Sequence, residues 1–217
     1  MEGDLKLEII SFDTLPSTQV YLTEAIKKHK LKAPICIIAD SQTDGIGSRD
    51  NSWVGLQGSL FASFALLIDD LPCDLPLQSA SVYFGKIMQE ILAGSNQDIW
   101  LKWPNDIYIN DSKIGGIITG VMNNTLVCGI GVNMGLNNAD FATYDTNESP
   151  YLILEKFLEL VEKKPSWKQI LSNVRIEFFK NKNYFAHTFL GKKSLKDALL
   201  CDDGSLEIDG ERVFSLR

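Results

Sequence analysis

The sequence is poor in residues that bind metals or form disulfides. Its 217 residues include four cysteines and two histidines. The cysteines are widely spaced and form no Cys-x-x-Cys pair, and Cys36 and Cys128 lie in apolar runs, where a thiol packs as a small hydrophobic side chain. His29 and His187 have no cysteine or carboxylate at metal-ligand spacing. We therefore predict free thiols and no histidine-based metal site.

The sequence also lacks a basic segment and a long hydrophobic run. Its formal net charge is −7, and no lysine- or arginine-rich stripe offsets the acidic residues, which argues against a general nucleic-acid binder. The most apolar stretch, residues 60–68, is too short to cross a bilayer, and there is no secretory signal pattern. With free thiols and no signal peptide, we expect a cytoplasmic protein that does not engage a membrane.

Hydrophobic patterning predicts an α+β fold with a mixed central β-sheet flanked by helices. Apolar alternation or β-branched runs predict strands at residues 5–12, 35–39, 58–68, 99–103, 107–109, 114–121 and 125–134. Helical spacing is found at residues 17–30, 77–92, 150–163 and 166–187. Strands and helices do not alternate regularly, which distinguishes this order from repeated βαβ units.

Two domains are predicted from these elements. Residues 1–190 contain all the longer elements and are long enough to bury a full core. Residues 191–217 contain short alternating runs that are broken by Asp-Gly turns. We predict three short strands there, forming a small C-terminal β domain.

The stretch KWPNDIYINDSKIGG, residues 102–116, has the highest density of polar and special residues. Pro104 lacks an N–H and weakens strand pairing, and Asn105-Asp106 can turn the chain. The resulting hairpin brings Lys102, Asp106 and Lys113 near one another. Two cations beside polar oxygens suit the joint binding of a carboxylate and a phosphate. A polar hairpin with solvated charges would explain the same residues, and spacing alone does not choose between the two.

Three other segments offer weaker signals. Ser17-Thr18 precedes a helix, where the hydroxyls can cap the helix or face a ligand at its positive end. Residues 40–53 are rich in Ser, Asp, Asn and Gly, which predicts a loop of some ten residues between buried strands. The run GIGVNM at 129–134 is typical of a strand end approached by a ligand, although a glycine-rich edge strand is nearly as good a reading.

Taken in order, these motifs resemble those of the biotin protein ligases, the biotin–[acetyl-CoA-carboxylase] ligase family. The resemblance covers residues 12–217 and is most specific in KWPND at 102–106, KIGGI at 113–117 and GIGVNM at 129–134. Ser17-Thr18-Gln19 is similar to the family's Ser-Thr-Asn near the start of the domain. The closing residues 215–217, Ser-Leu-Arg, are similar to the end of the family's small C-terminal β domain. The implied fold is the catalytic fold of class II aminoacyl-tRNA synthetases and biotin ligases with an SH3-like appendage.

The resemblance implies a two-step reaction. Biotin and ATP give biotinoyl-5′-AMP and pyrophosphate, and a lysine of a biotin carrier domain then displaces AMP. It implies that the catalytic residues are Lys113, Asp106, Lys102 and Arg49. It implies that biotin is bound by Ser17, Thr18, Gln19, Gln42, Gly45, Trp53, Lys113, Gly115 and Gly116. It implies that ATP is bound by Gly47, Arg49, Lys102, Asn105, Asp106 and Asn133, with Asp106 as a ligand of Mg²⁺.

The same resemblance sets the expected partners. We expect a carrier domain of acetyl-CoA or pyruvate carboxylase as the acceptor, and a homodimer is compatible with the family. Only a strand's length of chain precedes Ser17. The N-terminal winged helix of the family's bifunctional repressors would not fit there, so we expect no DNA binding.

The glycine-rich loop departs from the family pattern. The usual Gly-Arg-Gly-Arg-x-Gly-Arg is replaced by Gly-Ile-Gly-Ser-Arg-Asp-Asn at 45–51, which leaves Arg49 as the loop's only cation. Opposing carboxylates at Asp44 and Asp50 raise the cost of holding an anion nearby. We therefore expect the loop to be disordered without ligand and the adenylate to escape faster than from arginine-rich relatives.

Two other functions remain compatible with parts of the sequence. Lipoate or octanoate ligases share the catalytic fold and a central lysine, but their Arg-Arg-x-x-Gly-Gly-Gly stretch followed by His is missing from this sequence. A non-catalytic adenylate-binding relative would explain the altered loop at 45–51. The KWPND motif at 102–106 favours the biotin ligase.

Overall fold

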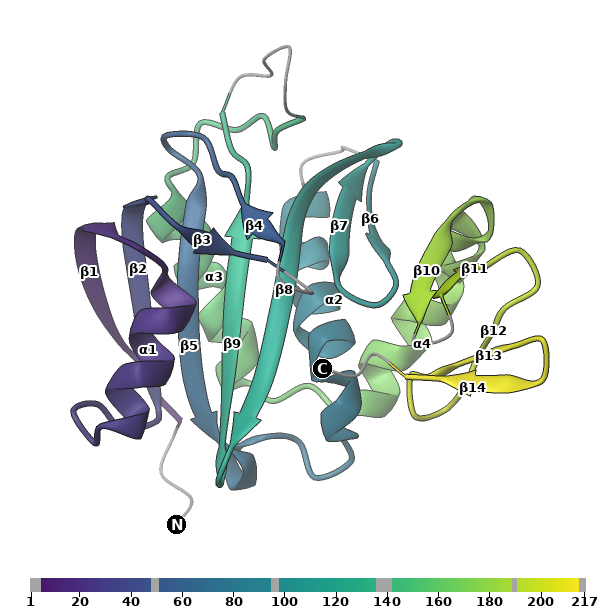
Figure 1. Cartoon of the computed structure of the whole chain (residues 1–217), viewed down its shortest axis with the longest axis horizontal. Coiled ribbons are helices and arrows are strands. Elements are labelled where there is room, and N and C mark those ends of the chain that lie inside the picture. Colours follow the sequence, from purple (N-terminus) through teal and green to yellow (C-terminus); the bar gives the residue numbers. More distant parts are fainter. Residues whose placement is uncertain (1–4, 48–50, 95–97, 136–141, 189–190, 215–217) are drawn as a thin grey trace.

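The computed structural model describes residues 5–47, 51–94, 98–135, 142–188 and 191–214, and a seven-stranded β-sheet lies at its centre (Figure 1). The strands follow the order β1-β2-β5-β9-β8-β7-β6, and only the β1–β2 pair is parallel among these neighbours. Their bounds are β1 Glu8–Leu15, β2 Ile35–Gln42, β5 Leu60–Leu67, β6 Ile99–Lys102, β7 Asp106–Ile109, β8 Ser112–Met122 and β9 Thr125–Val132. The predicted mixed sheet of an α+β fold is confirmed.

Helix α1 covers one face of this sheet, α2 and α3 lie behind the other, and α4 packs against α2 (Figure 1). Their bounds are α1 Thr18–Lys27, α2 Ala80–Ala93, α3 Pro150–Glu162 and α4 Trp167–Glu177. Serine caps begin three of them, since Ser17, Ser149 and Ser166 each accept a hydrogen bond from a backbone N–H of the first turn. None of the described helices is long and apolar enough to cross a membrane.

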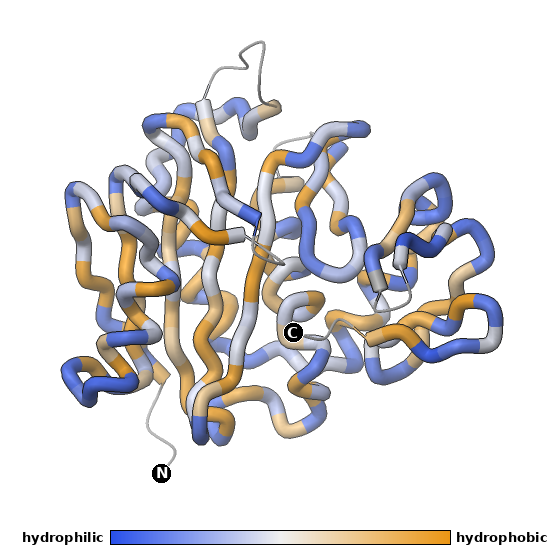
Figure 2. The backbone as a smooth tube through the Cα atoms, in the orientation of Figure 1, coloured by the Kyte–Doolittle hydropathy of each residue, from blue (hydrophilic) through white to orange (hydrophobic). Residues whose placement is uncertain are grey.

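The two faces of the sheet bury hydrophobic cores of different size. The larger core lies under α2 and α3, where Phe64 of β5 packs against Phe84 and Phe157 with ring centres 5.0 and 5.7 Å away. Burial of each such ring stabilises the fold by about 1.5–3 kcal/mol. The smaller core under α1 includes Leu22 and Ile37. Hydrophobic colour follows the central strands in Figure 2, and the turns at their ends are hydrophilic.

Two predictions about local structure were wrong. Residues 40–53 are not a plain loop, because β2 continues to Gln42 and a short ribbon follows, with β3 Gly45–Ile46 paired to β4 Ser52–Trp53. The helix predicted over 166–187 ends at Glu177 and continues as the 3₁₀ helix η3, Phe178–Asn183. Buried Asn181 explains the change. Its side chain forms hydrogen bonds with the backbone of Leu101 and Trp103 at the edge of the sheet, so this segment does not continue as an α-helix.

The C-terminal segment forms more strands than the three predicted. Strand β10 Phe185–Thr188 pairs with β11 Gly191–Ser194, and a three-stranded sheet follows. That sheet contains β12 Leu199–Leu200, β13 Leu206–Ile208 and β14 Glu211–Val213. The β10–β11 pair crosses the predicted domain boundary at residue 190, which itself stays a prediction. The two short 3₁₀ turns η1 Ile68–Asp70 and η2 Leu77–Ser79 complete the described elements.

Candidate active site

Strands β6, β7 and β8 bring three charged side chains together. Lys102 is opposite Asp106 in the β6–β7 pair, and Asp106 is opposite Gly116 in the β7–β8 pair. Lys113 Nζ lies 2.6 Å from Asp106 Oδ1, and Lys102 Nζ lies 3.5 Å from Asp106 Oδ2. The predicted convergence of these side chains is confirmed, whereas their chemical roles stay a prediction.

The two lysines of this cluster have different surroundings. The side chain of Lys102 is 16% exposed, and its Nζ lies 5.4 Å from the centre of the Tyr108 ring and 6.0 Å from that of Tyr184. Burial, together with the nearby charge of Asp106, raises the pKa of Tyr108 to about 12. The side chain of Lys113 is 38% exposed. Lys102 is therefore held in place by its neighbours, and Lys113 is the more accessible cation.

A group of neutral polar side chains lies on the β2–β5 side of the sheet. Thr18 Oγ1 lies 2.9 Å from Ser63 Oγ and 3.1 Å from Gln42 Oε1. The backbone N–H of Thr18 also donates to Gln42 Oε1, at 2.7 Å. Ser17 caps α1 beside them, with its Oγ 3.4 Å from the backbone nitrogen of Val20. These contacts fix the donors and acceptors before any ligand binds.

Glycines of β8 and β9 create a hollow between the two polar groups. A Cβ atom on Gly131 would lie 2.5 Å from Trp53 Cε2, and one on Gly129 would lie 2.8 Å from Gln19 Oε1. Side chains at these positions would fill the space that the indole and the amide occupy. Gly131 pairs with Gly116 across the two strands, so the hollow continues toward Lys113.

The hollow is a cavity of about 430 Å³, which includes the part open to solvent. It spans the sheet from α1 and β5 across β9 to β8. Its lining residues are Ser17, Thr18, Gln19, Gln42, Ile46, Gly47, Trp53, Ala62, Ser63, Asn105, Lys113, Gly116, Ile118, Gly129, Ile130 and Gly131. Most of the residues predicted from sequence to bind biotin therefore lie around one space.

Two polar atoms in the cavity wall have no hydrogen-bond partner among the described residues. They are the buried Gln19 Oε1 and Trp53 Nε1, and Asn133 Oδ1, just beyond β9, is a third such atom. An unpaired buried donor or acceptor costs about 1–3 kcal/mol. A ligand that supplies a donor to Gln19 and an acceptor to Trp53 would recover this free energy. These atoms mark the cavity as a binding site for a polar ligand.

Some of the predicted site residues lie elsewhere. Gly45 faces Trp53 and Gln42 from the short ribbon, and a Cβ on Gly115 would lie 2.9 Å from the carbonyl oxygen of Gly131, inside the β8–β9 pair. Neither lines the cavity. Arg49 is outside the described residues, so the expectation for its loop stays a prediction.

Ser63 and Ile118 also line the cavity, although the sequence did not single them out. Ser63 carried a usable signal, because it is a polar residue within the apolar strand Leu60–Leu67 and needs a partner when fully buried. Ile118 gave no such signal, because its position in the sequence is typical of any strand residue.

The described residues contain no group of three or more His, Cys, Asp or Glu side chains placed to hold a metal ion.

The model of the biotin/lipoate A/B protein ligase family matches residues 11–137, which include both the charged cluster and the cavity. The chain belongs to this family. Its fold is similar to the structure of biotin acetyl coenzyme A carboxylase synthetase from Helicobacter pylori with bound biotinylated ATP. That match has 43% identity and a TM-score of 0.91, and it covers 96% of this chain and 100% of the other.

Two curated relatives are similar over part of their length. Biotin–protein ligase 2 of Arabidopsis thaliana is 31% identical over 169 residues, which are 75% of this chain and 49% of the plant protein. The bifunctional ligase/repressor BirA of Bacillus spizizenii is 28% identical over 138 residues, which are 61% of this chain and 42% of BirA. The chain thus spans less than half the length of these two curated relatives.

Proposed function

We propose that this protein is an ATP-dependent biotin ligase that forms biotinoyl-5′-AMP and transfers the biotinoyl group to a lysine of a carrier protein. The proposal rests on one observation: the cavity has neutral hydrogen-bonding groups at one end and the charged Lys113 at the other. Biotin has a matching arrangement, because an apolar chain separates its neutral ureido ring from its charged carboxylate. The bound biotinylated ATP named for the Helicobacter pylori relative supports this reading.

The cavity wall suits each part of biotin in turn. The hydroxyls of Ser17, Thr18 and Ser63 can bond the ureido group, which has one acceptor and two donors. The unpaired Oε1 of Gln19 is an acceptor for a ureido N–H. Trp53 and Ile118 offer apolar contacts to the ring sulfur and the chain. Gly129 and Gly131 make room for the Gln19 amide and the Trp53 indole, which form the wall against which the biotin chain is proposed to lie.

In the first step, an oxygen of the biotin carboxylate attacks the α-phosphorus of ATP. A new O–P bond forms while the bond to the bridging oxygen breaks, and pyrophosphate leaves with that oxygen. Lys113 is proposed to offset negative charge on both reacting groups, and Lys102 to bind phosphate oxygens, which the closeness of the two ammonium groups to Asp106 supports. Asn133, with its unpaired Oδ1, is proposed to contact the adenine amino group, and Gly47, Arg49 and Asn105 to help place the nucleotide.

In the second step, the carrier lysine first loses its ammonium proton to solvent, and the neutral amine attacks the acyl carbon. AMP leaves with the phosphate oxygen, and the second proton of the amine is released to solvent as the amide forms. A free lysine is mostly protonated at neutral pH because its pKa is about 10.4. Asp106 is paired with Lys113 and Lys102, and substrate phosphates that draw these ammonium groups away would leave its carboxylate free. Asp106 can then accept hydrogen bonds from the incoming amine and orient it.

Magnesium is proposed to enter with ATP. Mg²⁺ prefers oxygen ligands and is usually held by substrate phosphates together with one or two carboxylates. Asp106 is a carboxylate beside the proposed phosphate site, but two ammonium groups already neutralise it. The phosphates of ATP would therefore supply most of the Mg²⁺ ligands, and Asp106 is the proposed protein ligand.

The proposed acceptor is a biotin carrier domain of a carboxylase. The name of the Helicobacter pylori relative, a carboxylase synthetase, supports an acetyl-CoA carboxylase carrier, and pyruvate carboxylase is the alternative. A cytoplasmic location, expected from the free thiols and the missing signal pattern, and a homodimer, which is compatible with the family, are further proposals. The family also includes lipoate ligases, but neither the dithiolane ring of lipoate nor the chain of octanoate offers hydrogen-bonding groups to match the neutral side chains around Thr18.

Calorimetric titration with biotin, then ATP, tests the proposal. We expect heat on addition of biotin, release of pyrophosphate when ATP follows, and no heat when lipoate or octanoate replaces biotin. Biotin binding without pyrophosphate release would favour a non-catalytic adenylate-binding relative. Binding of lipoate in preference to biotin would favour the lipoate ligase.

A further inference from the structure

Lys102 ends the outermost strand of the described sheet, β6, and the peptide groups on both sides of it are bound by one side chain. Asn181 Oδ1 accepts a hydrogen bond from the backbone N–H of Trp103 at 2.8 Å. Asn181 Nδ2 donates to the carbonyl oxygen of Leu101 at 3.2 Å. Asn181 is 1% exposed and 78 residues away from Trp103 in sequence. A distant segment thus takes the place of a strand neighbour at this edge.

A second distant segment binds the residue that follows Lys102. The indole N–H of Trp103 donates to the carbonyl oxygen of Gly204 at 2.9 Å, and Trp103 is 2% exposed. Gly204 belongs to the turn between β12 and β13, in the C-terminal three-stranded sheet. The edge of the catalytic sheet is therefore attached to the C-terminal sheet directly beside Lys102.

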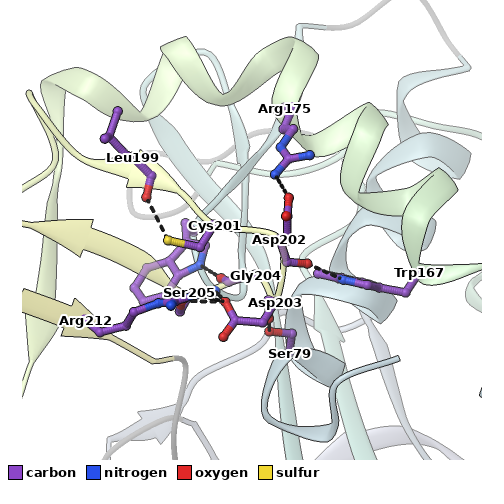
Figure 3. Close-up of polar contacts among 11 residues, drawn as sticks. Ser79, Trp167, Arg175, Leu199, Cys201, Asp202, Asp203, Gly204, Ser205 and Arg212 are labelled. Atoms are coloured by element: carbon purple, nitrogen blue, oxygen red, sulfur yellow. Dashed lines mark hydrogen bonds and ion pairs between the residues drawn. The ribbon is translucent and has the colours of Figure 1, made fainter. Parts of the chain in front are cut away.

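The turn at residues 202–204 is bound through three consecutive carbonyl groups. Trp167 Nε1 donates to Asp202 O at 2.8 Å, and Ser79 Oγ donates to Asp203 O at 2.5 Å (Figure 3). The third carbonyl, that of Gly204, is the one that binds the Trp103 indole. Gly204 has φ +79°, and a Cβ on it would lie 2.9 Å from Trp167 Cη2. Both the backbone angle and the close contact require glycine at this position.

The turn is also fixed from within. Asp203 Oδ1 accepts hydrogen bonds from Ser205 N at 3.1 Å and Ser205 Oγ at 2.6 Å. Arg212 of β14 donates to the same carboxylate oxygen at 3.0 Å (Figure 3). The carbonyl groups are therefore held in position before they meet the two indoles and the hydroxyl.

We infer that Trp103 and Asn181 are positioning residues for Lys102, and that the turn at 202–204 sets the place of this lysine at the reacting phosphate. The inference rests on the proposed function, since Lys102 is a phosphate ligand only in that reaction. Its basis is that one buried side chain, Asn181, binds the backbone on both sides of Lys102, and that a second distant segment binds the indole of the next residue, Trp103. The hydrogen-bonding groups around Thr18 come from α1, β2 and β5, which make none of these contacts with Asn181 or the turn.

The chain provides a matched control. Trp167 is buried like Trp103, at 4% against 2% exposed, and its indole donates to another carbonyl of the same turn, that of Asp202. Trp103→Phe and Trp167→Phe therefore remove equivalent hydrogen bonds. Only Trp103 is adjacent to Lys102. A purely structural role of the turn predicts equal effects of the two substitutions, whereas a positioning role predicts unequal effects on turnover.

The experiment compares the full-length wild type with these two variants. Calorimetry gives the biotin affinity and the number of biotin-binding sites, and pyrophosphate release per binding site gives kcat and the KM for ATP. For Trp103→Phe we expect a biotin affinity within about twofold of wild type and a kcat at least tenfold lower. For Trp167→Phe we expect kcat within twofold of wild type. Both variants should show similar losses of melting temperature.

Equal kcat values for the two variants, or wild-type kcat in Trp103→Phe, would overturn the inference while leaving the proposed function intact. A wild type that binds biotin but releases no pyrophosphate would overturn the proposed function and the inference with it. If Trp103→Phe forms no biotin-binding sites, Asn181→Ala is judged by the same criteria, because it removes the other attachment and leaves the indole in place.

Discussion

The two ends of the cavity are built in different ways. At the neutral end, Thr18, Gln42 and Ser63 come from three separate elements and satisfy one another through hydrogen bonds. At the charged end, Lys113 lines the cavity, and Asp106 and Lys102 lie next to it on the adjacent strands β7 and β6. These three side chains compensate one another through ion pairs. A preformed neutral site binds its ligand without rearrangement, whereas compensated charges must exchange partners when anionic groups arrive. We therefore expect the neutral end to govern biotin affinity and the charged end to govern turnover.

The largest effect is expected from Lys113→Ala at the charged end. Loss of this cation should cost adenylation about 3–4 kcal/mol, or a hundredfold or more in kcat, by comparison with the loss of a single preorganised donor. The fold should be spared, because the side chain is 38% exposed. Pyrophosphate release measures kcat, and calorimetry on the same sample shows through biotin binding whether the fold is intact. Turnover at the wild-type rate would contradict the assignment of Lys113.

Gly131→Ala should disturb binding more than chemistry. The new Cβ would lie 2.5 Å from Trp53 Cε2, so the indole must move out of the cavity wall. Overpacking of this kind typically costs about 1–3 kcal/mol, and we expect biotin affinity to fall about tenfold. Gly120→Ala on β8 is the control, because its Cβ would have no atom within 4 Å. Equal biotin affinity in the two variants would show that Trp53 does not shape the site.

Ser63→Ala tests the neutral end with a smaller change. It removes the hydroxyl partner of Thr18 Oγ1, and a typical hydrogen bond contributes about 0.5–1.5 kcal/mol. Biotin affinity should fall several-fold, with kcat at saturating biotin unchanged. Ser41→Ala is the control, since that hydroxyl bonds Thr14 at an exposed position outside the cavity. A fall in kcat without a change in affinity would reverse the division between the two ends.

The smallest effect concerns alkaline stability at the charged end. The folded protein raises the pKa of Tyr108 to about 12, through burial first and Asp106 second, above the value of about 10 expected in an unfolded chain. Between these values the unfolded state loses its proton first, so folding stability falls as pH rises from about 10 to 12. Tyr108→Phe should lessen that fall by less than about 1 kcal/mol, because the ring is only half buried. Urea unfolding at pH 9 and pH 11 measures it, and identical pH dependence in both proteins would contradict the assigned pKa.

The same contrast explains which parts of the site were readable in the sequence. Residues 102–116 are contiguous, so a proline, a turn and two strands predicted that Lys102, Asp106 and Lys113 meet. The neutral end requires the register of β5 against β9, which places Ser63 opposite Gly129. Local patterns do not contain that register. The resemblance supplied Thr18 and Gln42. Ser63 stands out in the sequence as a polar residue in an apolar strand, but its contact with Thr18 had to be seen in the structure.

The fold shows the same limit. Long periodic elements such as α2 and β9 were predicted, because their apolar spacing reflects the core that buries them. The helix predicted beyond Glu177 was wrong because Asn181 satisfies the edge of β6, a tertiary contact 78 residues away along the chain. The ribbon of β3 and β4 was missed because two-residue strands have no period to detect.

Biotin-dependent exchange of labelled pyrophosphate into ATP tests the central claim most directly, because it reports the reversible formation of the adenylate without a carrier. We predict exchange with biotin, none without it or with lipoate in its place, and at least a hundredfold slower exchange in Lys113→Ala. Exchange that does not require biotin, or that is unaffected by Lys113→Ala, would contradict the account of this cavity as the site where biotin is activated.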